Sequence, residues 1–233
     1  MNFITSSLHQ LYTAAQDRHP EILFYGSRAN RTIALTFDDG PHPRDTPRVL
    51  DVLEKHNVRV TFHLVGKHVE EHRSLIQQIH RSGHQLALHC YRHTPFPMER
   101  LDTLRRQLEH TRNVVADSGG VAPETIKDLR PPYGVFNKRT LSHLTEWGYR
   151  LVMWNCIPPH WMQPMSWSIQ QIMEAVMPGA VIVLHDGHGH GARVAEIVDH
   201  VVPRIQSLGY EFVRVEEMQK QREQLTVTRE ASC

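Results

Sequence analysis

The sequence predicts an α/β fold, a distorted (β/α) barrel with about seven parallel strands. Short apolar runs alternate with segments of helical spacing along most of the chain, and this alternation favours parallel strands joined by right-handed crossovers. Polar residues follow directly after several apolar runs, as they do at the mouth of an α/β barrel, where the carboxyl ends of the strands converge. The first turn, Gly40-Pro41, lacks the Gly-x-Gly-x-x-Gly pattern of a dinucleotide-binding sheet, so the barrel is preferred over a doubly wound sheet.

Each predicted strand is a short apolar run bounded by polar or turn residues. The predicted strands span residues 32–37, 58–65, 85–88, 127–129, 150–154, 180–184 and 211–215. Five of these strands are followed directly by polar residues that bear on function, and these strand-end residues are Asp38 with Asp39, His89, Arg130, Asn155 and His185. In a barrel, all of these side chains would meet at one mouth.

The segments between the strands show helical spacing and helical stop signals. Leu101, Leu104 and Leu108 recur on one helical face, and glycines follow several such segments, as expected for left-handed C-caps. An amphipathic helix is predicted over residues 2–17, packed on the barrel rather than on a membrane. The resulting division is an N-terminal helix and lead-in over 1–30, a catalytic barrel over 31–217, and a polar tail over 218–233 that begins as a helix.

Composition excludes several classes of protein. The 26 basic and 25 acidic residues nearly balance, so no strong field attracts nucleic acid. The 3 cysteines are widely spaced, which argues against a disulfide framework or a thiolate zinc site. The sequence shows no export signal and no apolar stretch of about 20 residues that could span a membrane. We therefore expect a cytoplasmic protein if Met1 is the native start, and an extracytoplasmic one if the sequence has been trimmed.

Two clusters of polar residues indicate metal chemistry. Asp38 and Asp39 end the first predicted strand; an Asp-Asp-Gly sequence alone is typical of a turn, but adjacent carboxylates can also divide metal binding and proton transfer between them. His89 and His93 follow another strand, and on a helical turn this spacing would put both rings on one side, within reach of one ion. One strand-end carboxylate and two imidazoles form a ligand set that suits Zn²⁺ and leaves positions for water and substrate.

Five ordered motifs resemble those of the NodB-type polysaccharide deacetylases, carbohydrate esterase family 4. The similarity covers roughly residues 31–217, and the motifs are Thr36-Phe37-Asp38-Asp39-Gly40-Pro41, His89-Cys90-Tyr91-Arg92-His93, Arg130-Pro131-Pro132-Tyr133-Gly134, the segment 155–161, and Val183-Leu184-His185-Asp186-Gly187. The resemblance implies that Asp39, His89 and His93 hold a divalent metal. Zn²⁺ is the first choice, with Co²⁺, Ni²⁺ or Mn²⁺ as alternatives.

The resemblance also implies the roles of the remaining residues. Asp38 would be the general base that activates the attacking water, Arg130 would orient Asp38 and keep it ionised, and His185 would be the general acid. The backbone N–H of Tyr133 would stabilise the oxyanion. The implied substrate contacts are Tyr133, Pro132, Trp161 and Leu184, the last lining a pocket for the acetyl methyl group.

The chain departs from the family pattern at two positions. Cys90 stands where the family has Ser or Thr, and the weak thiol donor predicts a modest effect on the loop. His160 stands where the family places an Asp that raises the pKa of the catalytic histidine. A neutral imidazole can accept a hydrogen bond from His185 but supplies no negative charge, so we expect His160 to lower the apparent pKa of His185 and to move the activity optimum towards acid pH.

The sequence therefore predicts a metal-dependent hydrolase that removes N-acetyl groups from an acetylated amino sugar, such as a chitooligosaccharide or another N-acetylglucosamine-containing saccharide. Two alternatives stay open: a deacetylase of a non-carbohydrate amide, and a catalytically weak, metal-retaining sugar-binding module. The expected partner is an acetylated saccharide, without nucleic acid and without a membrane span. Arg130 could instead bridge a surface loop, and His185 could be a core histidine.

Overall fold

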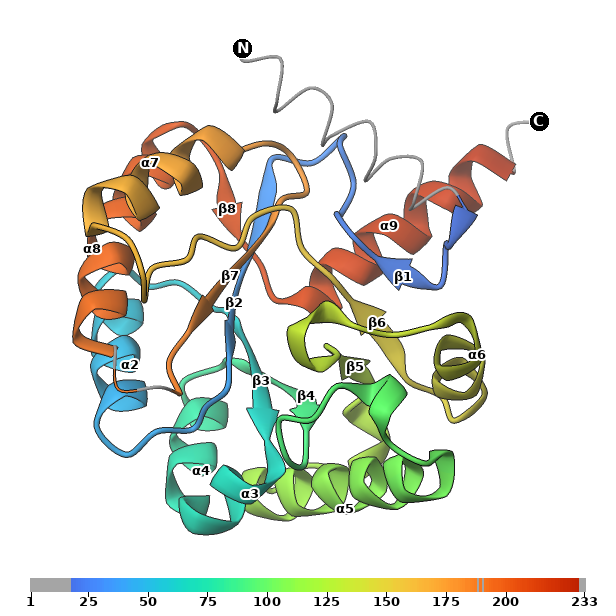
Figure 1. Cartoon of the computed structure of the whole chain (residues 1–233). Helices are drawn as coiled ribbons and strands as arrows, with labels where there is room; N and C mark the ends of the chain where they lie inside the picture. Colours follow the sequence, from blue (N-terminus) through green and yellow to red (C-terminus); the bar gives the residue numbers. More distant parts are fainter. Residues whose placement is uncertain (1–17, 188, 190, 231–233) are drawn as a thin grey trace.

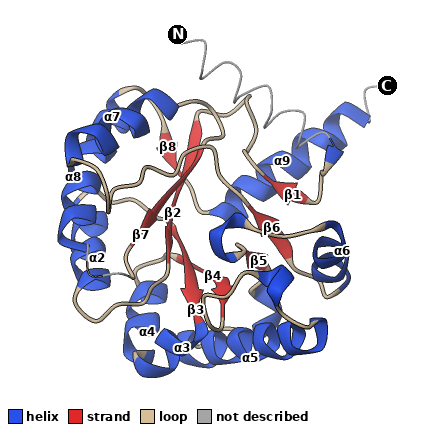
Figure 2. Ribbon diagram, in the orientation of Figure 1, coloured by secondary structure: helices blue, strands red, loops and turns tan. Residues whose placement is uncertain are grey.

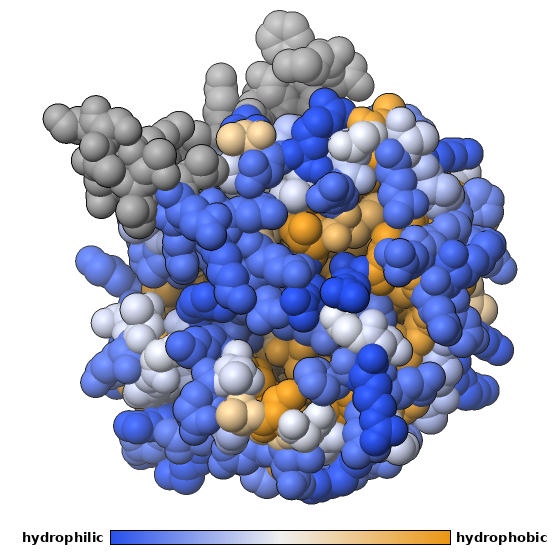
Figure 3. All heavy atoms as spheres, turned by 180° about the vertical axis from the view of Figure 1, so that it is seen from behind, coloured by the Kyte–Doolittle hydropathy of each residue, from blue (hydrophilic) through white to orange (hydrophobic). Residues whose placement is uncertain are grey.

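A computed structural model of the chain describes residues 18–187, 189 and 191–230. The helix predicted over residues 2–17 lies outside the described residues. Strands form the centre of the molecule and helices surround them (Figures 1 and 2). Seen from the side opposite to Figure 1, the surface is mainly hydrophilic with small hydrophobic areas between polar ones (Figure 3).

All strand pairs among the described residues are parallel. The sheet runs in the order β1-β6-β5-β4-β3-β2-β7, with β8 paired to β2 near the start of β2. The strands are β1 (Ile22–Leu23), β2 (Thr32–Asp38), β3 (Thr61–Val65), β4 (Gln85–Cys90), β5 (Asp128–Leu129), β6 (Arg150–Val152), β7 (Val181–His185) and β8 (Glu211–Phe212). This curled parallel sheet confirms the predicted α/β barrel-like fold.

The helices cover the outside of the sheet. They are α2 (Asp45–Lys55), α3 (Gly66–Glu71), α4 (Arg73–Arg81), α5 (Leu101–Gly119), α6 (Lys138–Glu146), α7 (Met165–Ala175), α8 (Gly191–Ser207) and α9 (Val215–Glu230), with 3-10 turns η1 (Phe96–Met98), η2 (Pro123–Thr125) and η3 (Pro132–Gly134). Every residue of β2, β3 and β4 is buried, because these strands have the sheet interior on one side and helices on the other. None of the described helices combines the length and apolar character needed to cross a bilayer.

Helix α9 closes the amino-terminal end of the sheet. Its first backbone N–H groups, at Val215 and Glu216, donate to Thr61 Oγ1 and Gln85 Oε1, which belong to the first residues of β3 and β4. Met218 is completely buried in a small apolar cluster with residues of β1, β2, β6 and β7. The segment predicted as a polar tail from residue 218 is thus helical to Glu230, and it packs against the barrel at its start.

The structure differs from the predicted elements at the short strands. β1 was missed because two residues carry no periodic signal, and it places residues before 31 in the sheet by pairing with β6. The strand predicted over 58–65 begins at Thr61, and the one predicted over 211–215 ends at Phe212. Val215, predicted as the last residue of that strand, is instead the first residue of α9.

Candidate active site and metal centre

Asp38 and Asp39 lie at the carboxyl end of β2, where the backbone changes direction sharply. Asp39 adopts a left-handed conformation with φ of 72°, and both carboxylate side chains line the same cavity. Two glycines permit this turn: a Cβ at Gly187 would lie 2.2 Å from the Asp39 carbonyl oxygen, and one at Gly40 would lie 2.6 Å from Asp186 Oδ1. The Asp pair therefore lies on a turn and also lines the cavity, so the two interpretations of the sequence are compatible.

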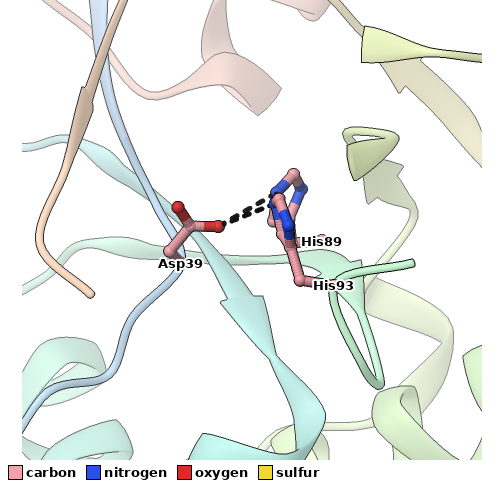
Figure 4. Close-up of side chains that lie close together, drawn as sticks. All are labelled: Asp39, His89 and His93. Atoms are coloured by element: carbon pink, nitrogen blue, oxygen red, sulfur yellow. Dashed lines mark hydrogen bonds and ion pairs between the residues drawn. The ribbon is translucent and has the colours of Figure 1, made fainter. Parts of the chain in front are cut away.

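Asp39, His89 and His93 form the cluster predicted to hold a metal ion (Figure 4). Asp39 Oδ1 lies 3.3 Å from His89 Nε2 and 3.1 Å from His93 Nε2, and the two Nε2 atoms are 3.1 Å apart. The four-residue spacing would put both rings on one side of a helical turn, but the structure brings them together differently: His89 belongs to β4, and His93 follows in an irregular loop. The loop doubles back after the strand, so the rings still meet, with centroids 5.0 Å apart.

The hydrogen bonds around this cluster fit a metal-binding role. His89 Nδ1 lies 2.7 Å from the Arg130 carbonyl oxygen, so Nδ1 carries a hydrogen and Nε2 is the ring nitrogen that faces Asp39 and His93. Burial lowers the pKa of His89, but its hydrogen bond to Asp39 and the charges of Asp38 and Asp39 outweigh burial and raise the pKa overall. An anionic oxygen and two imidazole nitrogens converging from three sides are the donors that Zn²⁺ prefers.

Arg130 and Asp38 form a buried ion pair beneath the cavity. Arg130 is completely buried, and its Nη1 donates to Asp38 Oδ1 at 2.6 Å and to Thr36 Oγ1 at 2.8 Å. Its Nε and Nη2 donate to the carbonyl oxygens of Val152 and Met153, both at 3.1 Å. Burial lowers the pKa of Arg130, and Asp38 opposes that change. Arg130 is thus not a surface arginine; it fixes one carboxylate oxygen of Asp38.

His185 lies opposite Asp38 because β2 and β7 are paired with Asp38 in register with His185. The His185 ring lies 5.3 Å from the ring of His160 and 5.0 Å from that of Trp161, measured between centroids. His185 lines the cavity, which places it at the mouth of the barrel rather than in the core.

The cavity at the barrel mouth has a volume of about 520 Å³ and contains most of the predicted site residues. Its described lining residues are Asp38, Asp39, His89, His93, Tyr133, Trp154, Ile157, His160, Trp161 and His185. Tyr133 has φ of 56° and stands 64% exposed at the rim, with its ring 4.5 Å from that of His93. Trp154 and Ile157 were missed as cavity residues. Trp154 is the last residue of a predicted strand and Ile157 follows three residues later, and this strand-end position was the signal that could have found them.

Two predicted substrate contacts do not reach this cavity. Leu184 is completely buried and is not among the described lining residues, because neighbouring residues of a strand point to opposite faces and His185 takes the cavity side. Pro132 is also buried and shapes the η3 turn that carries Tyr133. Neither residue is among the described residues that line the cavity, and their contact with substrate stays a prediction.

Two buried groups beside the site were not predicted. Asp186 follows His185, and burial first, together with the charges of Asp39 and Asp38, raises the pKa of Asp186 to about 7 against the lowering effect of the Thr46 hydrogen bond. His63 of β3 donates from Nδ1 to the Leu88 carbonyl oxygen at 3.2 Å. Burial, with the Arg130 and His89 charges, lowers the pKa of His63 well below its ordinary value. His63 is therefore neutral at neutral pH, and Asp186 keeps its proton to a higher pH than an ordinary carboxyl group does.

Similarity to known proteins shows the family of the chain. A family model described as polysaccharide deacetylase matches residues 25–152. The chain is 31% identical over 216 residues to the peptidoglycan-N-acetylglucosamine deacetylase PgdA of Listeria monocytogenes, covering 92% of this chain and 44% of that protein. It is 34% identical over 159 residues to a chitooligosaccharide deacetylase of Rhizobium leguminosarum bv. trifolii, covering 68% of this chain and 73% of that protein. The chain thus spans less than half the length of the Listeria relative.

The fold is also similar to a solved structure. The crystal structure of the Bc1960 peptidoglycan N-acetylglucosamine deacetylase, in complex with 4-naphthalen-1-yl-N-oxidanyl-benzamide, matches with a TM-score of 0.80 at 30% identity. The match covers 84% of this chain and 91% of that one. The overall fold described above is therefore one that is already known from experiment.

Proposed function

Because the chain belongs to the polysaccharide deacetylase family, we propose that it is a metal-dependent hydrolase that removes N-acetyl groups from an N-acetylglucosamine-containing saccharide. One observation carries this proposal: the ion-paired Asp38 and the Asp39, His89, His93 cluster open into the same cavity. A base next to a cation site is the arrangement that hydrolysis of an unactivated amide needs.

Asp39, His89 and His93 are the residues that would hold the cation. A divalent cation there would polarise the acetamide carbonyl and acidify a water molecule, and Zn²⁺ suits the nitrogen and oxygen donors best. His89 keeps its Nε2 lone pair towards that position through its Nδ1 hydrogen bond to the Arg130 carbonyl. Arg130 therefore supports both the metal cluster and the base: its carbonyl oxygen orients His89, and its side chain holds Asp38.

Asp38 removes a proton from the attacking water. Arg130 Nη1 binds Oδ1 of Asp38, so the carboxylate is held in one orientation and its other oxygen can accept the proton. The backbone N–H of Tyr133, on the strained η3 turn, is the donor that we assign to the developing oxyanion. His185, on the neighbouring strand, donates a proton to the nitrogen that leaves as an amine.

The aromatic walls of the cavity support a sugar as substrate. Tyr133, Trp154 and Trp161 line it, and the flat faces of such rings pack well against the apolar face of a pyranose ring. The relatives named above act on N-acetylglucosamine units, in peptidoglycan for one and in chitooligosaccharides for the other.

Acetate release from a panel of chitooligosaccharides and peptidoglycan fragments, with added Zn²⁺ or Co²⁺, tests the proposal. We expect acetate from at least one substrate, and Asp38→Asn should abolish release while Zn²⁺ binding, measured by calorimetry, persists. Release from a small acylated amine but from no saccharide would favour a non-carbohydrate amide. Zn²⁺ and saccharide binding without acetate release from any substrate would identify a metal-retaining binding module.

A further inference from the structure

His160 is a completely buried histidine whose backbone is fixed from both sides. The segment after β6 runs along β7, with a parallel bridge between Cys156 and Ile182 and a hydrogen bond from Val183 N to the Cys156 oxygen at 2.9 Å. This pairing carries the chain to His160 at the same level as His185 at the end of β7. The pairing of the two segments therefore determines that the two imidazoles face each other.

The ring of His160 is held in one tautomer. Its Nδ1 lies 3.0 Å from the Pro158 carbonyl oxygen, which can only accept, so Nδ1 carries the hydrogen and Nε2 is the acceptor atom of the ring. The planes of the His160 and His185 rings are inclined by 31° to each other. The Trp161 ring stands nearly perpendicular to both, and its centroid lies 5.0 Å from the centroid of each. Trp161 thus restricts how far either imidazole can turn.

Arg193 of α8 fixes the same loop from outside the cavity. Its Nη1 donates to the His160 carbonyl oxygen at 3.1 Å and to that of Gln163 at 3.4 Å. Arg193 is not among the described residues that line the cavity, so it acts on the site through the backbone of His160.

We propose that His160 is a positioning residue for His185: it offers an imidazole Nε2 acceptor, held in place by Pro158 and Arg193, against which the side chain of His185 orients. The inference rests on the proposed function, in which His185 donates the proton to the leaving nitrogen. His160 does not take part in the proton transfers assigned to Asp38 and His185; it acts through His185.

The charged groups near His185 come from several elements, but none of them from the His160 loop. Asp38 faces His185 from β2, Asp186 follows it on its own segment, and Arg193 approaches the His160 loop from α8. The loop itself brings no carboxylate, because the sequence has no Asp or Glu between Glu146 and Glu174. The neighbouring His188 and His190 lie outside the described residues. A carboxylate at position 160 would therefore add a negative charge to a loop that has none.

A pair of isosteric variants separates charge from shape. In Zn²⁺-loaded protein with ¹⁵N-labelled histidine, the His185 signals are assigned by their loss in His185→Gln, and their titration is followed in His160→Asp and in His160→Asn. We expect the titration midpoint of His185 in His160→Asp to lie at least about one pH unit above that in His160→Asn. Both variants replace the His160 ring, whose centroid lies 5.3 Å from that of His185, so the carboxylate acts on His185 at short range. Equal midpoints in the two variants would overturn the proposal.

A second pair tests positioning without a new charge. His160→Gln places an amide near the Nε2 position and His160→Leu does not. The kcat for acetate release should therefore be about tenfold lower in His160→Leu than in His160→Gln, with similar KM. Arg193→Met should also lower kcat, although Arg193 is not among the described residues that line the cavity. If His160→Leu and His160→Gln have equal kcat, or if Arg193→Met leaves kcat at the wild-type value, the proposal is wrong. If no substrate releases acetate, the proposed function fails, whereas the histidine titration still decides the pairing.

Discussion

Replacing Asp186 by Asn should make the metal-free protein more stable at neutral pH, with a benefit that depends on pH. Asp186 is completely buried directly after β7, where the Thr46 hydroxyl donates to Oδ2 and the Asp186 N–H donates to the Asp38 carbonyl oxygen at 3.2 Å. Burial, with the charges of Asp39 and Asp38, raises the pKa of Asp186 from 3.8 to about 7. The folded protein therefore keeps a proton on Asp186 that the unfolded chain releases.

The sign and size of the effect follow from proton linkage. Between pH 4 and pH 7 the folded state binds one more proton at this residue, so its contribution to the free energy of unfolding falls by about 1.4 kcal/mol per pH unit as the pH rises. Below pH 4 both states are protonated at Asp186 and the contribution is absent. A pKa difference of about 3 units corresponds to a loss of about 4 kcal/mol above pH 7, which Asp186→Asn removes.

Urea denaturation of both proteins between pH 4 and pH 8, in the presence of a chelator, measures this difference. The many other titrating groups contribute equally to both curves, so the difference between the two free energies isolates Asp186. We expect the advantage of Asp186→Asn to grow steadily up to about pH 7 and then level off. A difference that does not change with pH would show that Asp186 ionises normally in the folded protein.

Three further predictions concern the charged core and the turn. Arg130→Met should lower the free energy of unfolding by about 3–5 kcal/mol, because it leaves Asp38 buried without its partner; urea denaturation measures this, and a loss below about 1 kcal/mol would contradict it. His89→Ala should weaken Zn²⁺ binding at least 100-fold in a chelator competition assay, whereas an unchanged affinity would place the ion elsewhere. Gly187→Ala should weaken both stability and Zn²⁺ binding, because its Cβ would displace the Asp39 backbone; equal Zn²⁺ affinity in a folded variant would show that the turn can adapt.

The strand-end residues were predictable because apolar runs and the polar residues that follow them are local patterns. Asp38, His89, Arg130 and His185 all lie near the carboxyl ends of parallel strands, as predicted, since parallel pairing brings those ends to one edge. The sequence pattern therefore located the cavity correctly without defining its shape.

Other features depend on backbone conformations and contacts that spacing does not encode. The four-residue spacing of His89 and His93 suggested a helical turn, but it belongs to a strand followed by a loop that folds back. Leu184 is not among the described lining residues, because strand alternation gives that side to His185. Arg193 was invisible to sequence reasoning because it reaches the His160 loop only when α8 packs beside it.

The base side and the acid side of the site are stabilised in different ways. On the base side, Asp38 is held by the side chain of Arg130, while the Arg130 carbonyl orients His89, so one residue couples the proton acceptor to the metal cluster. On the acid side, His185 contacts the rings of His160 and Trp161, and Arg193 holds the backbone of His160. The loop that carries His160 contains no Asp or Glu.

The same contrast explains why Asp186 can retain its proton. Arg130 pairs with Asp38, and the negative charge of Asp39 adds to the burial that raises the pKa of Asp186. A cation held by Asp39, His89 and His93 would offset that charge and lower the pKa of Asp186. Metal binding and the protonation of Asp186 are therefore linked, and the pH dependence of stability attributed to Asp186 should be smaller in the Zn²⁺-loaded protein than in the metal-free one.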